Sequence, residues 1–188
     1  MEDINPLYLK KDIIDQIKNS YIESDPHIIN LPNFLSINSY ESLLNNLDRM
    51  TPAHKKIADR FSYSEHDIDI NLLKDKAFLS WISEITRKKA KNVNYRCLRF
   101  GHKDYTLLHD SEAIGDRLEF FILIMKRWDT KWGGHTVYVA HDQQPILFPL
   151  EGNSFNLIQK TKNRHKFIQY INHHSGKENL YIIEGFIE

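Results

Sequence analysis

The chain has 188 residues and a mass of 22.3 kDa, which suits one ordinary domain and leaves too little for two. Apolar residues make up 41% and charged residues 27%, so the composition supports a packed core and argues against global disorder. The 25 basic and 25 acidic residues cancel, which gives no electrostatic support to a nucleic-acid or anionic-membrane partner.

The cysteine content and the N-terminal sequence indicate in which cellular compartment the protein is expected. A single cysteine, Cys97, excludes an intramolecular disulfide framework and a thiolate zinc site, and it fits a reducing environment. The first residues carry no basic stretch leading into an apolar run, and no apolar run reaches the roughly 18 residues that a membrane span needs. We therefore expect a cytoplasmic protein without a signal peptide or a transmembrane segment.

The first half of the chain, residues 1–91, reads as a mainly helical segment that packs on a core. Apolar residues at helical spacing, such as Ile13, Ile14 and Ile17, mark its helices, while the residues before Pro32 favour an extended chain. We predict helices over residues 9–21, 39–47 and 73–89, an extended stretch over 27–35, and a polar loop over 51–71 that could serve as a lid.

From residue 92 onward, short β segments replace the helices. We predict strands over 92–100, 105–110, 117–125, 135–141, 145–150, 154–160, 165–172 and 179–187. Turn-like groups separate them, and no helices lie between them. The pattern predicts an α+β, mainly β protein. Residues 92–188 form an antiparallel sandwich or barrel, and the whole chain forms one domain.

Two histidines stand where a metal site could form. His109 ends a predicted strand next to Asp110, Ser111 and Glu112, and His165 opens a strand far along the chain. Two histidines and one carboxylate in this layout are typical of a facial triad, which binds Fe(II) and leaves coordination positions open. Each histidine taken singly is more often a surface or turn residue than a ligand.

The order of these elements resembles the prolyl-4-hydroxylase-like family of 2-oxoglutarate/Fe(II) oxygenases. The resemblance is carried by the entry segment at residues 25–47, the segments 96–110 and 117–125, Trp128 and Trp132 before Gly133-Gly134, His165-Lys166-Phe167, and Gly185-Phe186. It implies a double-stranded β-helix, or jelly roll, whose mouth holds iron and 2-oxoglutarate. It also implies hydroxylation of a prolyl or similar residue in a protein or peptide.

The resemblance implies particular iron ligands. His109 falls on the first iron-binding histidine and His165 on the second. The family motif His-x-Asp has Ser111 at its third position here, so the acid would be Asp110 or Glu112. Asp110 can ligate only if the backbone turns, because neighbouring residues of a strand point to opposite faces. A second match to the motif, at residues 102–104, lies in the preceding turn. A site with two histidines only, as in related halogenases, and a chain without iron stay open.

The same resemblance implies a cation that holds the distal carboxylate of 2-oxoglutarate. The family position for it, on the last strand, falls on Leu180. Lys177 could reach inward from the turn if the register slips, although a solvated turn lysine is its commoner role. Arg99 could reach from the opposite side of the barrel. Tyr105 shares the face of His109 and could hydrogen-bond the cosubstrate.

Three readings therefore stand side by side. The first is a 2-oxoglutarate-dependent hydroxylase with Fe(II) as cofactor, a protein or peptide substrate, and a monomeric or homodimeric state. The second is an iron-free jelly-roll binding module, because a fold does not fix a function. The third is a cupin-like metal protein that does not use 2-oxoglutarate.

Overall fold

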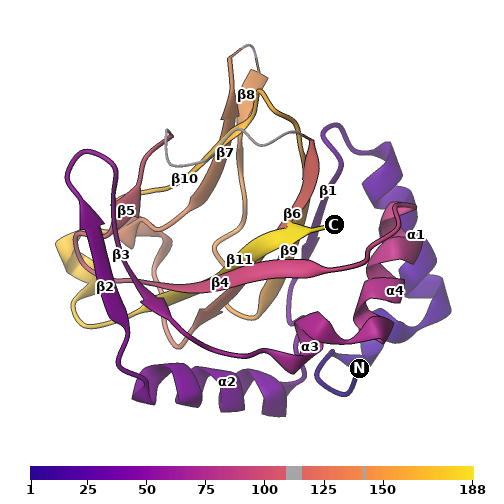
Figure 1. Cartoon of the computed structure of the whole chain (residues 1–188), viewed down its shortest axis with the longest axis horizontal. Coiled ribbons are helices and arrows are strands. Elements are labelled where there is room, and N and C mark those ends of the chain that lie inside the picture. Colours follow the sequence, from indigo (N-terminus) through magenta and orange to yellow (C-terminus); the bar gives the residue numbers. More distant parts are fainter. Residues whose placement is uncertain (109–115, 142) are drawn as a thin grey trace.

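Two antiparallel β-sheets face each other in the computed structural model, which describes residues 1–108, 116–141 and 143–188 (Figure 1). The larger sheet has the strand order β1-β9-β6-β11-β4-β3-β2, with β5 beside β3, and the smaller has the order β10-β7-β8. The strands of the larger sheet are β1 (Ile28–Leu31), β2 (Ala53–Ile57), β3 (Phe61–His66), β4 (Val93–Phe100), β5 (Tyr105–Thr106), β6 (Arg117–Met125), β9 (Ser154–Lys160) and β11 (Leu180–Ile187). Those of the smaller are β7 (Thr136–Ala140), β8 (Gln143–Leu147) and β10 (His165–Ile168).

The space between the sheets is filled by alternate residues of their strands, because side chains along a strand point to opposite faces. Leu180 and Ile182 of β11 point into this interior, where they join Phe121 of β6, while Tyr138 of β7 and Ile168 of β10 enter from the smaller sheet. All five side chains are buried. We call this space the barrel interior, and it is predominantly apolar.

The other face of the larger sheet is covered by helices. They are α1 (Lys11–Glu23), α2 (Ile37–Arg49), α3 (Asn71–Lys74) and α4 (Lys76–Thr86), and Figure 1 shows them outside the barrel. Helix α1 buries Ile14, Ile17 and Tyr21, which lie three and four residues apart and so share one face. None of the helices in the described ranges is long and apolar enough to cross a membrane.

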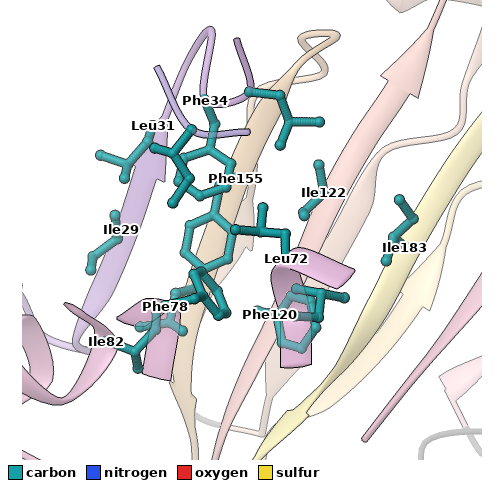
Figure 2. Close-up of a cluster of buried hydrophobic side chains, with 14 of the residues drawn as sticks. Ile29, Leu31, Phe34, Leu72, Phe78, Ile82, Phe120, Ile122, Phe155 and Ile183 are labelled. Carbon is teal, nitrogen blue, oxygen red and sulfur yellow. The ribbon is translucent and has the colours of Figure 1, made fainter. Parts of the chain in front are cut away.

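Phe155 of β9 lies at the centre of this helix-covered layer (Figure 2). Its ring centroid is 4.7 Å from that of Phe34, 6.0 Å from Phe120, and 6.1 Å from both Phe78 and Trp81. Aromatic pairs at such separations contribute beyond the area that they bury. Phe78 and Trp81 of helix α4 therefore pack on the sheet through this aromatic cluster.

Most predicted elements are confirmed with small shifts of their ends. Strands β6 and β9 match the predicted segments, and helices α1 and α2 each differ by about two residues at their ends. The predicted helix over 73–89 is divided, because Asp75 ends α3 and caps α4 by accepting a hydrogen bond from the Ala77 backbone N–H.

The predicted turn at Gly133 and Gly134 has backbone φ angles of 89° and 87°, a region that favours glycine.

The predicted loop over residues 51–71 is wrong, because β2 and β3 form a hairpin there. All five residues of β2 are exposed, so the strand lacks the apolar alternation by which strands are recognised. It forms one edge of the larger sheet, and lysines such as Lys55 and Lys56 are typical of edge strands, where they discourage pairing with another chain. The proposed lid is thus part of the sheet.

Replacing Phe155 should test the aromatic layer. We expect Phe155→Ala to lower the free energy of unfolding by about 4 kcal/mol, because it leaves a cavity among four rings. Ile37→Ala, at a side chain that is 72% exposed, should change it by less than about 0.5 kcal/mol. Urea denaturation followed by circular dichroism measures both. Equal losses in the two variants would contradict this account of the core.

Candidate functional site

One end of the barrel gathers charged side chains. Strands β4, β6 and β10 begin at this end, and β7, β9 and β11 finish there, as the pairings of Val93 with Ile187 and of Arg117 with Lys160 show. We call it the open end. Two of the residues expected to bind iron, His109 and Asp110, lie outside the described residues, as does Glu112.

His165, the third expected ligand, begins β10 at the open end. It pairs with Val139 of β7, while the next residue, Lys166, pairs with Tyr138. Residues directly opposite each other in an antiparallel pair share a face, and Tyr138 is fully buried in the barrel interior. Lys166 therefore points inward and His165 lies on the outer face of the smaller sheet. Its role as an iron ligand stays a prediction.

The expected cosubstrate contacts are also dispersed. Arg99 pairs with Tyr181 on the face of β4 that points away from the barrel interior, and its Nη2 is 3.4 Å from Ser64 Oγ. Lys177 is exposed in the turn before β11. Tyr105 lies on the short strand β5, with its ring centroid 6.3 Å from that of Tyr170. The arginine of β4 that points inward is Arg96.

The second match to the family motif, residues 102–104, is a structural turn. Asp104 accepts hydrogen bonds from Ser62 Oγ at 2.6 Å and from the Gly101 backbone N–H at 2.9 Å. Lys103 has φ of 75°, as in a tight turn. Because both oxygens of Asp104 already accept hydrogen bonds, this segment is better explained by its role in the turn.

Glu184 of β11 forms the centre of the first charge cluster at the open end. Its Oε1 accepts hydrogen bonds from Arg96 Nε at 2.9 Å and Arg96 Nη2 at 2.7 Å, and its Oε2 lies 2.8 Å from Lys166 Nζ. Burial alone would raise the pKa of Glu184, but Lys166 and Arg96 outweigh it and hold the pKa at about 2. The carboxylate stays ionised and joins the two sheets.

Glu119 of β6 forms the centre of a second cluster. Its Oε1 accepts hydrogen bonds from Arg117 Nε at 2.8 Å, with Arg117 Nη2 at 2.7 Å, and its Oε2 accepts one from the Tyr138 hydroxyl at 3.1 Å. Burial, with the nearby carboxylates Glu119 and Glu184, raises the pKa of Tyr138 well above its ordinary value. Tyr138 is therefore a hydrogen-bond donor at neutral pH, and like Glu184 it connects the two sheets.

Lys160, at the end of β9, is a buried cation that belongs to neither of these two ion-pair clusters. Its side chain is fully buried, and its Nζ has no hydrogen-bond partner in the part of the chain that the structure describes. Burial lowers the pKa of this ammonium, and Glu119 counteracts the shift in part. Prediction from the sequence missed Lys160, Lys166 and both glutamates. Charged residues at alternate positions of apolar strands, such as Glu119 and Glu184, were the available signal.

The described residues can be tested for the ligand set that an iron site needs. Within residues 1–108, 116–141 and 143–188 no group of three or more histidine, cysteine, aspartate or glutamate side chains could hold a metal ion. Deeper in the barrel, where the family would place the distal end of 2-oxoglutarate, Leu180 packs with Leu98 and Ile182. The described residues therefore do not complete an iron site by themselves.

Comparison with known proteins defines the class of fold. A prolyl-4-hydroxylase from Pseudomonas putida superposes with a TM-score of 0.69 over 93% of this chain and 98% of its own, at 10% identity. A Trichoplax adhaerens prolyl hydroxylase, solved with a hypoxia inducible factor peptide fragment, gives 0.68 over 99% and 94%, also at 10% identity. The chain thus has the jelly-roll fold of these enzymes, as its sequence predicts.

The sequence comparisons show the family. Residues 53–187 match the family described as oxoglutarate and iron-dependent oxygenase degradation C-term, and the chain belongs to it. Mouse prolyl 3-hydroxylase OGFOD1 is 32% identical over 78 residues, which cover 40% of this chain. The frog protein of the same name, from Xenopus laevis, is 30% identical over 81 residues. The matched segment spans only 14% of the mouse protein and 16% of the frog protein.

Removing the central carboxylate should destabilise the open end. We expect Glu184→Gln to lower the free energy of unfolding by about 3 kcal/mol, because it leaves Lys166 without its buried partner, while Arg96 is half-exposed and recovers hydration. The depressed pKa adds a pH dependence. The stability that Glu184 contributes is complete above its ordinary pKa of 4.5 and is lost as the pH falls toward about 2.

Urea titrations between pH 7 and pH 2.5 measure both effects. The difference between wild type and Glu184→Gln should shrink over the acid part of that range. Glu151→Gln, at an exposed carboxylate, serves as the matched control and should follow wild type throughout. A constant difference at all pH values would show that Glu184 is not the titrating group.

Proposed function

We propose that the chain is a 2-oxoglutarate- and Fe(II)-dependent oxygenase that hydroxylates a prolyl or similar residue of a protein or peptide. The observation that carries the proposal is the family match, because residues 53–187 contain both segments assigned to iron, around His109 and at His165. His109, Asp110 and His165 are the proposed ligands, and bound iron would supply the activation of oxygen. The neighbour solved with a peptide fragment supports a peptide substrate.

The proposal includes a cellular setting. We assign the protein to the cytoplasm, as a monomer or homodimer that acts on a protein or peptide rather than on nucleic acid or a membrane. The equal numbers of basic and acidic residues and the single buried cysteine support this assignment.

A second function, an iron-free binding module, is favoured by specific observations at the same place. Ser111 occupies the position of the family acid, and Leu180 occupies that of the family cation. His165 lies on the outer face of β10, and ion pairs occupy the interior of the open end. In this alternative the fold is retained as a scaffold and performs no oxidation.

One anaerobic titration separates the two functions. Fe(II) and then 2-oxoglutarate are added to the whole chain, and the weak visible charge-transfer absorption of their chelate is recorded. We expect wild type to show the band and His109→Ala and His165→Ala to lose it, because each removes a proposed ligand. His173→Ala, at an exposed turn histidine, should keep the band.

The outcomes assign the function. Absence of the band and of iron binding in wild type would reject the oxygenase and leave the binding module. Iron binding without any effect of 2-oxoglutarate would identify a metal protein of the cupin type. A band that survives His165→Ala would reject this histidine as a ligand, in agreement with its outward position on β10.

A further inference from the structure

The interior of the open end carries more positive than negative charge. Four cations point into it from different strands, namely Arg96, Arg117, Lys160 and Lys166. Two carboxylates face them, Glu119 and Glu184. Among the described residues of this interior, the balance is therefore two positive charges in excess.

Neighbouring acids do not remove this excess. Glu65 forms an ion pair with Lys55 at the edge of the sheet. Asp116 is exposed, accepts a hydrogen bond from the Lys162 backbone N–H at 3.1 Å, and acts on Lys160 only at longer range. Tyr138 adds no charge, because its hydroxyl donates a hydrogen bond to Glu119 and burial raises its pKa.

Lys160 is the cation of this cluster that has no hydrogen-bond partner among the residues the structure describes. It is 0% exposed, lies directly opposite Arg117 in the pairing of β9 with β6, and forms no hydrogen bond within the described chain. Arg117 is held in place by Glu119 and by the ring of Phe186, whose centroid is 4.7 Å from the guanidinium carbon. An unpaired ammonium in a buried site is costly, so this position favours an anion.

We propose that Lys160, with Arg117 and Lys166, binds a small dicarboxylate at the open end. Two carboxylate groups match the two excess charges, and the ammonium of Lys160 supplies three unused donors. The cation comes from β9, whereas the family position on the last strand is the apolar Leu180. The identity of the dicarboxylate as 2-oxoglutarate rests on the proposed function, but binding through Lys160 requires no iron.

Calorimetry on metal-free protein in EDTA tests the site. We expect 2-oxoglutarate to bind wild type, and Lys160→Met to weaken binding at least tenfold. Lys162→Met, which removes an exposed lysine two residues away, should leave binding unchanged. Succinate should bind within a few-fold of 2-oxoglutarate, and propionate at least tenfold more weakly, because it offers one carboxylate. Absence of binding to wild type, or equal binding by Lys160→Met, would overturn the proposal.

Thermal unfolding distinguishes a binding role from a structural one. We expect Lys160→Met to raise the midpoint without ligand, because it removes a buried unpaired charge, and to abolish the rise that 2-oxoglutarate causes in wild type. A lowered midpoint would show that Lys160 stabilises the fold through a partner of its own, which contradicts the proposal.

The two proposals can fail separately. Dicarboxylate binding that depends on Lys160, without an iron charge-transfer band, would support the anion site and reject the oxygenase. A band that is unaffected by Lys160→Met would support the oxygenase and reject this anion site.

Discussion

The ion pairs of Glu184 are the interaction on which the open end depends. Strand β11 lies at the middle of the larger sheet and is buried on both faces, so a carboxylate there must be fully compensated. Arg96 compensates it from the neighbouring strand and Lys166 from the opposite sheet. Glu119 and Tyr138 make a second polar connection between the sheets. At this end the sheets are joined by charge and hydrogen bonding, whereas further inside they are joined by apolar packing.

This arrangement constrains any chemistry at the site. A facial triad needs neutral imidazoles and a carboxylate with free lone pairs pointing at one position. The two glutamates inside the open end have both oxygens engaged by cations or by Tyr138, so neither is available to a metal without breaking these contacts. An iron site in this chain therefore needs ligands other than these two glutamates.

The sequence predicts the fold well because the central strands leave little ambiguity. Strand β6 has nine residues, of which seven are apolar, and helices α1 and α2 carry clear apolar stripes. The β2–β3 hairpin is missed because β2 buries nothing. The face of His165 is harder to predict. The segment His165–Ile168 offers one polar and one apolar residue to each face of the strand. Its sequence therefore does not show which face points into the barrel, and only the pairing with β7 decides this.

The charged cluster bears on the choice between enzyme and scaffold. A scaffold that binds nothing at the open end gains no advantage from a fully buried lysine that has no hydrogen-bond partner among the described residues, because an apolar side chain of similar volume there would be more stable. The cost of burying Lys160 is recovered when a negative charge pairs with it, and no described carboxylate hydrogen-bonds to its ammonium. Since Glu119 and Glu184 are already satisfied by Arg117, Arg96 and Lys166, that charge has to come from outside the described network. The electrostatics of the open end thus favour a chain that binds an anion, whether or not it also oxidises a substrate.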